Sequence, residues 1–433
     1  MSIAAKLPAA PVDRLTRPLA RFLHIESAGG IVLLVCAIAA LVLANSPAAD
    51  AYHLFWHTHV ALEIGGFTLV GELGHFFVND VLMTIFFFVV GLEIKRELVA
   101  GELNEVRKAA LPVVAAIGGM VVPAGIYFAL MNGRPGERGW GIPMATDIAF
   151  VVGVMAVLGQ RVPLGLKIML LSLAIVDDIG AVVVIAAFYN AGLDWFMLAL
   201  AGCALAAIVL LRFIGLRSIP VYVVIGACVW LGFYKSGVHP TVAGVILGLM
   251  TPSGTWVSRA SLRLGLTDLA AELRENGDGE VEAEDLRLLA FAAREAVSPL
   301  DRLETLLHPW VGFVVMPLFA LANAGVEVKT QALGDPIALA VALGLFAGKP
   351  VGVLLFSWLA VRVGIARLPE GVTWSMTAGA GVLAGIGFTM SLFVAGLALD
   401  AEHLAAGKVG TLAGSLLSAV VGVVVLGLAT RRK

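Results

Sequence analysis

The chain has few charged residues and few cysteines for its length. Only 14% of its 433 residues are Asp, Glu, Lys or Arg, whereas a soluble protein carries about a quarter. The net charge of −2 provides no basic excess for binding nucleic acid. Cys36, Cys203 and Cys228 all lie in apolar stretches without metal-ligand spacing, which indicates small core residues. Hydrophobic residues make up 60% of the chain, so we predict an all-α polytopic membrane protein.

Apolar stretches long enough to cross a bilayer recur along the whole chain. We predict about twelve transmembrane helices, at 29–45, 74–98, 109–131, 140–158, 164–189, 193–213, 219–234, 239–250, 307–326, 336–363, 373–399 and 403–430. Basic residues cluster on one side of this arrangement, at 14–21, 95–108, 161, 212–217, 362–367 and 431–433. The positive-inside rule makes that side cytoplasmic and places both termini there. Residues 1–433 are thus expected to form a single transmembrane domain.

Two connections have a pattern of their own. Residues 62–69 alternate around Gly65-Gly66, which favours a β-hairpin within the outer segment 51–73, with a plain loop as the alternative. An isolated hairpin is marginally stable in water, so this one is expected to pair with a second copy. The cytoplasmic segment 251–306 is rich in acidic residues. It reads as a polar insert with one amphipathic helix at 286–296 and disorder around 276–279.

Two of the predicted helices contain a segment that interrupts a helix. Residues 140–158 include Pro143, Thr146 and Asp147, and residues 373–399 include Gly385-Ile386-Gly387. Non-helical backbone at membrane depth is tolerated only where it is buried in protein or lines a cavity. Counted along the twelve predicted spans, these are helices 4 and 11. They are the middle members of the triplets 3–5 and 10–12, and inverted-topology repeats have broken helices at corresponding positions of their two halves. A proline kink and Gly-rich packing are the alternatives.

Asp177 and Asp178 stand side by side in the middle of the stretch 164–189. A carboxylate at that depth costs about 2.5–3.5 kcal/mol on insertion scales, so the pair is expected to face a wet cavity, a cation or a proton. Lys349 also lies in mid-span and needs a counter-charge, which Asp177 or Asp178 can supply. Hard oxygen ligands suit hard cations, and a site that binds either a proton or a cation gives exchange. A purely structural bridge is the alternative.

Further charged residues fall at the two ends of the stretch 74–98. Asp80 lies near its outer end, and Glu93, Arg96 and Glu97 lie at its inner end. The inner group is either a positive-inside anchor or, together with Glu304 and His308, a pH-responsive network. His239 is interpreted as a helix-end residue.

The motifs of this chain resemble those of the NhaA family of bacterial sodium/proton antiporters, in order and along nearly the whole length. They are Gly91–Leu98 (GLEIKREL), Ala145–Phe150 (ATDIAF), Val176–Ile179 (VDDI), Ser236–His239 (SGVH), Leu307–Trp310 (LHPW), Ala322–Gly325 (ANAG), Gly348–Pro350 (GKP) and Gly385–Ser391 (GIGFTMS). This family is itself a known case of inverted repeats with broken helices, so the two arguments are not independent.

The resemblance implies a non-enzymatic, electrogenic exchanger that exports cytoplasmic Na⁺ or Li⁺ for external H⁺ across the bacterial inner membrane by alternating access. It implies activation at alkaline pH, a role in sodium and pH homeostasis, and no cofactor. Asp178 would be the main ligand of the transported Na⁺ and Asp177 its partner, paired with Lys349. Thr146 and Asp147 would support this site, Asp80 would line an outer funnel, and Glu93, Arg96, Glu97, Glu304 and His308 would sense pH. The hairpin at 62–69 would be the contact of a homodimer.

Two residues depart from the pattern that the resemblance leads us to expect. Asp301 stands where we expect a basic residue, and Thr305 where we expect histidine. Both belong to the expected pH-sensing region, so the pH profile is the property that these departures affect.

Two other functions use some of the same residues. An intramembrane aspartyl protease also needs two aspartates, but its carboxylates converge from two helices, whereas neighbours on one helix point about 100° apart. A passive cation channel would use the same charges but would need neither Lys349 nor paired broken helices. A flux assay with an imposed Na⁺ gradient separates the three.

Overall fold

The computed structural model describes residues 26–64, 67–190, 192–216, 218–258, 260–267, 283–327 and 334–431. Within these ranges, nine helical segments are long and apolar enough to cross a membrane. Two bent helix pairs also pass that test, and the apolar helix α10 is shorter. These twelve segments correspond to the twelve predicted spans, which confirms an all-α polytopic membrane protein.

The first half of the chain contains the hairpin and the first broken helix. Its elements are α2 (Glu26–Ala44), α3 (Ala49–Trp56), β1 (His59–Ile64), β2 (Phe67–Glu72), η2 (Leu73–Leu82), α4 (Met83–Ala100), η3 (Glu102–Asn104), α5 (Val106–Met131), η4 (Glu137–Met144), α6 (Ile148–Leu158), η5 (Gly159–Arg161), α7 (Leu164–Phe188) and α8 (Trp195–Phe213).

The second half contains the polar insert and the second broken helix. Its elements are α9 (Ile219–Ser236), α10 (Thr241–Met250), α12 (Ala283–Glu295), α13 (Pro299–Trp310), η6 (Val311–Val315), α14 (Met316–Asn323), α16 (Pro336–Leu343), η7 (Gly344–Gly348), α17 (Lys349–Val363), α18 (Trp374–Ala384), α19 (Phe388–Ala398) and α20 (Ala401–Arg431).

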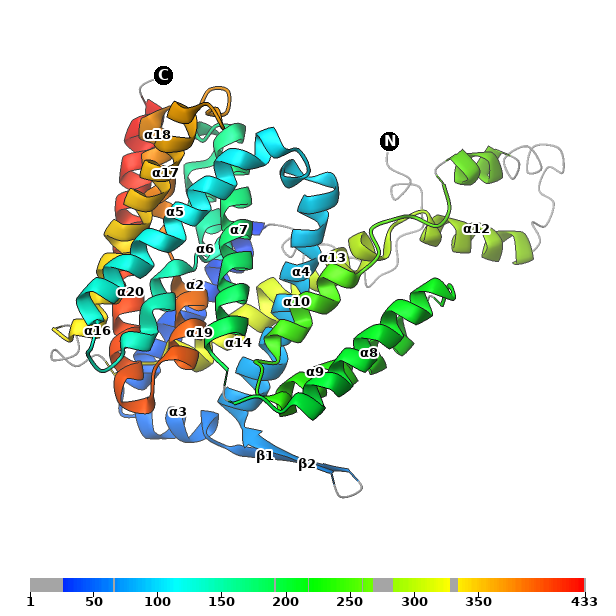
Figure 1. Cartoon of the computed structure of the whole chain (residues 1–433), viewed down its shortest axis with the longest axis horizontal. Coiled ribbons are helices and arrows are strands. Elements are labelled where there is room, and N and C mark those ends of the chain that lie inside the picture. Colours follow the sequence, from blue (N-terminus) through cyan, green and yellow to red (C-terminus); the bar gives the residue numbers. More distant parts are fainter. Residues whose placement is uncertain are drawn as a thin grey trace, which may run out of the picture.

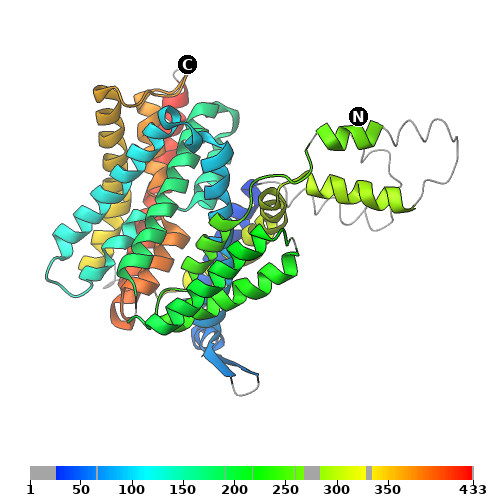
Figure 2. The same ribbon diagram turned by 45° about the vertical axis from the view of Figure 1, so that its right-hand side comes forward.

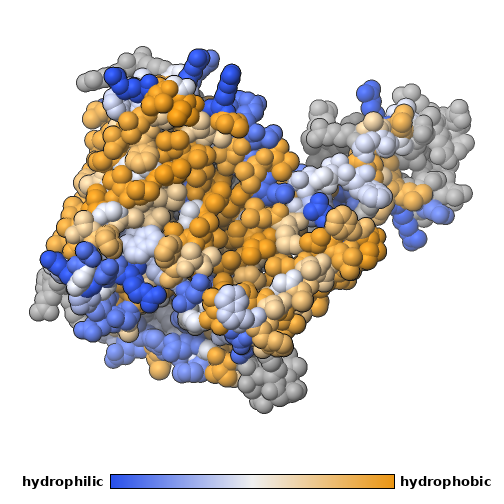
Figure 3. Space-filling view, viewed as in Figure 1, coloured by the Kyte–Doolittle hydropathy of each residue, from blue (hydrophilic) through white to orange (hydrophobic). Residues whose placement is uncertain are grey.

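The helices form one bundle with two distinct ends. The β1–β2 hairpin projects from one end, here called the hairpin side, and α20 finishes at the opposite end, here called the C-terminal side (Figure 1). Helix α12 extends sideways beyond the bundle in both ribbon views (Figure 2). On the face shown in Figure 3, a broad hydrophobic surface lies between hydrophilic ends, as expected for a membrane-embedded protein.

The predicted hairpin is confirmed, and it is longer than the sequence pattern suggested. Strand β1 pairs antiparallel with β2 over six residue pairs, from His59 opposite Glu72 to Ile64 opposite Phe67. The expected turn at 65–66 lies outside the described residues, as does the expected disorder at 276–279. The amphipathic helix of the insert is present as α12 and begins three residues earlier than predicted.

The helix that carries Glu304 and His308 begins at Pro299, so the predicted start at 307 is wrong. Ser298 caps this helix by accepting a hydrogen bond from the backbone N–H of Asp301. The Asp301 carboxylate accepts one in return from the Ser298 hydroxyl, at 2.7 Å. This serine cap with proline at the first helical position starts the helix two turns before the apolar stretch begins.

Glycine allows two pairs of helices to approach until their backbones touch. A Cβ added to Gly352 of α17 would lie 2.1 Å from the carbonyl oxygen of Gly118 in α5. A Cβ on Gly244 of α10 would lie 2.4 Å from the carbonyl oxygen of Thr84 in α4. Small residues at such crossings are the usual basis of close packing between membrane helices. These contacts fix α17, which begins at Lys349, against α5, and they fix α10 against α4, which carries Glu93 and Arg96.

Among the described residues, three π-helical segments, which the sequence pattern does not indicate, interrupt the long helices. They are η2, which contains Asp80, η6, which follows α13, and η7, which directly precedes Lys349. Such segments shift the faces of a helix by part of a turn and occur frequently at functional sites. Each of the three lies in a span that carries candidate residues.

Candidate functional site

The two broken helices cross at their breaks, in the interior of the bundle. The first is helical to Met144 at the end of η4, is extended at Ala145, and resumes as α6. The second consists of α18 and α19, whose axes are bent by 45°. The backbone N–H of Asp147 donates to the carbonyl oxygen of Ile386 at 2.7 Å, so the two interruptions contact each other directly. Both predicted breaks are therefore present, and neither is a simple proline kink.

Asp147 caps two half-helices at once. Its Oδ1 accepts from the backbone N–H of Phe150 at 3.1 Å, in the first turn of α6. Its Oδ2 accepts from the backbone N–H of Thr389 at 3.1 Å, in the first turn of α19, and from the Thr389 hydroxyl. A carboxylate at a helix N-terminus satisfies free N–H groups and offsets the positive end of the helix dipole. Asp147 thus compensates the two N-terminal ends that the breaks create.

Lys349 places a positive charge at the negative C-terminal end of η4, whereas Asp147 places a negative charge at two N-terminal ends. Its side chain is fully buried, and its Nζ lies 2.7 Å from Oδ2 of Asp177. The same Nζ donates to the carbonyl oxygen of Met144, the last residue of η4. The stem of Lys349 passes beside Gly119 of α5, where an added Cβ would lie 3.6 Å from Cε. Of the two aspartates that the sequence left open, the structure pairs Asp177 with this lysine.

Thr146 connects Asp177 to the second broken helix. Its hydroxyl lies 2.7 Å from Oδ2 of Asp177 and 2.9 Å from the carbonyl oxygen of Ala384, the last residue of α18. Both partners are acceptors and a hydroxyl carries one proton, so Thr146 donates to one of them at a time. The hydroxyl is therefore placed to respond to the charge of Asp177.

Asp178 is buried beside this network without being part of it. Only 2% of the residue is exposed. Within the part of the chain that the structure describes, Oδ1 of Asp178 and Oδ1 of Asp177 have no hydrogen-bond partner. The described residues also contain no group of three or more His, Cys, Asp or Glu side chains that could hold a metal ion. An ionised buried carboxylate without a partner is costly, so a proton or a cation on Asp178 would relieve that cost.

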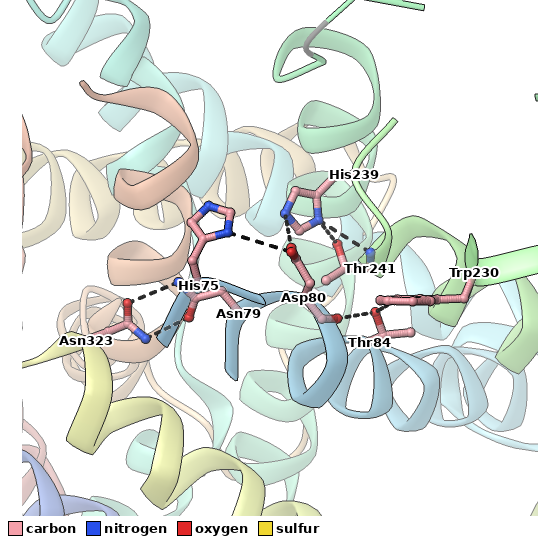
Figure 4. A network of polar contacts seen from close by, with 8 residues as sticks. All are labelled: His75, Asn79, Asp80, Thr84, Trp230, His239, Thr241 and Asn323. Atoms are coloured by element: carbon pink, nitrogen blue, oxygen red, sulfur yellow. Dashed lines mark hydrogen bonds and ion pairs between the residues drawn. The ribbon is translucent and has the colours of Figure 1, made fainter. Parts of the chain in front are cut away.

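On the hairpin side, Asp80 lies between two histidines (Figure 4). Its carboxylate oxygens are each 3.7 Å from one imidazole nitrogen, Nδ1 of His75 and Nε2 of His239. The neighbouring Asn79 exchanges two side-chain hydrogen bonds with Asn323 of α14, at 2.8 and 3.4 Å. The predicted interpretation of His239 as a plain helix-end residue is incomplete, because its ring also faces Asp80.

On the C-terminal side, α4 and α13 bring together four of the five residues expected to sense pH. Arg96 forms an ion pair with Glu304, and Nδ1 of His308 lies 3.5 Å from Oε1 of Glu93. The carboxylate of Glu97 instead accepts the backbone N–H of Glu102 at 3.1 Å, next to η3.

The two departures from the family pattern have local partners in this helix. The carboxylate of Asp301 is held by the Ser298 hydroxyl, as described above, and the Thr305 hydroxyl donates to the carbonyl oxygen of Asp301 at 2.7 Å.

Three participants were not identified from the sequence. Thr389 follows the Gly-Ile-Gly break by two residues, so its spacing marks a first-turn position in the second half-helix but does not identify Asp147 as its partner. His75 stands five residues before Asp80. Residues at that spacing are neighbours in a π-helix but not in an α-helix, so the sequence did not indicate that the two side chains lie close together. The carbonyl oxygen of Met144 is a backbone group and cannot be identified from residue type.

Comparisons with known proteins place nearly the whole chain in one family. A profile of the family described as Na⁺/H⁺ antiporter 1 matches residues 20–426. The Na⁺/H⁺ antiporter NhaA of Rhodopirellula baltica is 50% identical over 418 residues, which cover 96% of this chain and 95% of that protein. The NhaA protein of Rhizobium meliloti is 47% identical over 428 residues, covering 98% of both chains. NhaA 2 of Vibrio vulnificus is 47% identical and covers 96% of this chain and 94% of its own length. A chain matched so completely belongs to the Na⁺/H⁺ antiporter 1 family.

Proposed function

We propose that this protein is a transporter, and not an enzyme, that exchanges Na⁺ or Li⁺ for H⁺ at Asp178. The observation that carries the proposal is the contrast between the two neighbouring aspartates. Asp177 has a counter-charge in Lys349 at 2.7 Å, whereas Asp178 is equally buried and has no ion pair among the described residues. A buried carboxylate that lacks a fixed counter-charge binds either a proton or a hard cation, and it cannot hold both well.

The crossing of the broken helices supports alternating access, in which one site is presented to each side of the membrane in turn. Asp147 and Lys349 compensate the helix ends inside the bundle with side chains, so the half-helices can shift without exposing an uncompensated end. Arrival of a cation at Asp178 changes the charge next to the Lys349–Asp177 pair. Alternating access then follows when this change favours one arrangement of the half-helices over another.

Sidedness and assembly complete the proposal. The positive-inside pattern assigns the C-terminal side, and with it both termini, to the cytoplasm of a bacterial inner membrane. Exchange then exports cytoplasmic Na⁺ and supports sodium and pH homeostasis. The hairpin is proposed as the contact of a homodimer, because two isolated strands gain stability by pairing with a second copy. Cross-linking of cysteines introduced into β1 in native membranes tests this contact.

Activation at alkaline pH is assigned to the ion-pair cluster between α4 and α13. Arg96, Glu304, Glu93 and His308 are coupled within one small region, and coupled groups titrate as a unit. Because α13 continues through η6 into α14, a change of charge in this cluster acts on a helix that crosses the bundle. Glu97 is the neighbour of Arg96 on α4 but is outside the cluster, and it is proposed to support the cluster indirectly by holding η3.

The test measures Na⁺-driven proton movement in proteoliposomes with a pH-sensitive dye. We expect Asp178→Asn to abolish exchange, because the amide keeps the shape of the side chain but cannot hold a proton or balance a cation. The matched control is Asp194→Asn, since Asp194 caps α8 through two backbone N–H groups and asparagine caps equally well. Substantial exchange by Asp178→Asn overturns the site assignment.

The same vesicles separate exchange from a passive channel and test electrogenicity. An exchanger moves protons against an imposed Na⁺ gradient, and a channel does not. An electrogenic exchanger also runs faster when valinomycin and K⁺ clamp the membrane potential. Equal rates with and without the clamp contradict electrogenic exchange.

A further inference from the structure

His75, Asp80 and His239 form a cluster of polar side chains on the hairpin side (Figure 4). The side chain of Asp80 is only 5% exposed, yet both of its oxygens face an imidazole nitrogen at 3.7 Å. The two histidines differ sharply in exposure, at 69% for the side chain of His75 and 9% for that of His239. Two titratable groups in such different environments around one carboxylate have different roles.

His239 is held as a neutral imidazole whose ring N–H faces Asp80. The backbone N–H of Thr241 donates to its Nδ1 at 3.4 Å, and the Thr241 hydroxyl lies 2.7 Å from the same nitrogen. Because Nδ1 accepts, the ring proton is on Nε2, the nitrogen that faces Asp80. His239 lies in the connection between α9 and α10, where burial lowers its pKa to about 4. Its charge therefore stays at zero throughout the ordinary pH range.

His75 is the member of the cluster that can change its charge. Imidazole is the side chain whose ordinary pKa lies between pH 5 and 8, and this one is open to solution on the hairpin side. The other charged groups nearby come from β2 and α9. Glu72 is already paired with His57, at 2.7 Å, and Lys235 lies over the ring of Tyr234, 5.7 Å from its centre. Neither an arginine nor a lysine is paired with Asp80 among the described residues.

We propose that His75 is a charge switch that sets how strongly Asp80 attracts cations at the hairpin-side mouth of the transport pathway. When His75 is neutral, the charge of Asp80 is unbalanced and raises the local concentration of Na⁺. When His75 is protonated, it cancels that charge, and Na⁺ released to an acidic exterior returns to the site less readily. This inference rests on the proposed exchange function.

The test measures the Na⁺ concentration that gives half-maximal Na⁺ uptake, in right-side-out membrane vesicles with a fixed internal pH. The external pH is set to 6 or 8. In the wild type, this concentration rises on acidification because protons compete at the central site and because His75 becomes charged. In His75→Gln only the first cause remains. At pH 6 the variant should therefore need about fivefold less Na⁺ than the wild type, the factor that one unit charge at about 4 Å gives in water, and at pH 8 the two should agree.

Three further variants isolate the charge of His75 from its shape. His75→Lys carries the charge at both pH values and should need more Na⁺ than the wild type at pH 8. His59→Gln, an exposed imidazole on β1, should follow the wild type at both. His239→Asn should keep the wild-type ratio between pH 6 and pH 8, because His239 is neutral at both.

The outcomes distinguish this inference from the function on which it rests. Absence of Na⁺/H⁺ exchange in the wild type defeats the proposed function. Exchange in the wild type with an identical pH ratio in His75→Gln defeats the charge switch alone. Loss of the pH ratio in His239→Asn, or an effect of His75→Gln only when pH is changed inside the vesicles, also overturns it.

Discussion

The ion pair between Lys349 and Asp177 allows a quantitative test of how the crossing is held together. Both side chains are completely buried, and the charged atoms are 2.7 Å apart. Asp177→Asn keeps an oxygen for the Thr146 hydroxyl but removes the counter-charge of the lysine. Leaving one buried charge unpaired costs about 3–5 kcal/mol. Unfolding entropy of about 2.1 cal/mol/K per residue gives about 0.9 kcal/mol/K for this chain, so the loss corresponds to a fall in melting temperature of about 3–6 °C.

The double variant separates a charge effect from general damage. Asp177→Asn with Lys349→Gln removes both charges, so most of the lost stability should return and the melting temperature should lie above that of either single variant. The assay is a thermal melt of purified protein in detergent, followed by intrinsic fluorescence and checked by size-exclusion chromatography. Additive losses in the double variant would refute the reasoning, because they would mean that the two side chains do not interact.

An exposed ion pair of similar length provides the matched control. Lys108 and Glu105 are 3.0 Å apart, with 54% and 64% of their side chains exposed. Pairs of this kind contribute about 0–1 kcal/mol, so the same double-variant cycle should show shifts no larger than about 1 °C. A control cycle with effects as large as those of the buried pair would show that burial is not the cause.

Three further predictions concern the pH response and the helix packing. Glu304→Gln should shift the pH at which exchange reaches half its maximal rate while the maximal rate changes less, and an unchanged midpoint would contradict the sensor assignment. The double variant Asp301→Lys and Thr305→His, which adds positive charge and an imidazole, should activate at lower pH and more steeply than the wild type; activation at the same or higher pH would place these positions outside the sensor. Gly352→Leu should reduce the yield of monodisperse protein, because its Cβ would overlap the backbone of α5, whereas Gly202→Leu, with nothing within 4 Å of the added Cβ, should be tolerated.

The parts of the fold that depend on local pattern were predictable from the sequence. The apolar stretches predicted the twelve spans, and the alternation around Gly65-Gly66 predicted the hairpin. The segments around Pro143 and Gly385-Ile386-Gly387 predicted the two helix breaks. The start at Pro299 was missed because hydropathy was weighed above capping. A Ser-Pro pair followed by Asp301 is a helix start even where the following residues are polar.

The arrangement of the candidate site depended on information that a single sequence holds only weakly. The choice between Asp177 and Asp178 as partner of Lys349 is a question of helix rotation, and adjacent residues differ by about 100°. Rotation in turn depends on η7, because a π-helical segment just before Lys349 changes the direction in which the side chain points. The contact of Asp147 with Thr389 joins two segments whose local patterns say nothing about each other. Proximity of this kind follows from packing of the whole bundle.

The shared cap at Asp147 has a consequence for the synthesis of the protein. Asp147 and Thr389 are 242 residues apart in the chain, and translation proceeds at about 5–20 residues per second, so roughly 12–48 s pass between their appearance. During that interval, α6 is already made while its carboxylate lacks the second half-helix. The N-terminal spans are therefore present in the membrane while the carboxylate of Asp147 still lacks its hydrogen bonds to α19. A nascent chain truncated before α19 should be a preferred substrate for membrane chaperones and proteases, and completion of the last two spans should end that vulnerability.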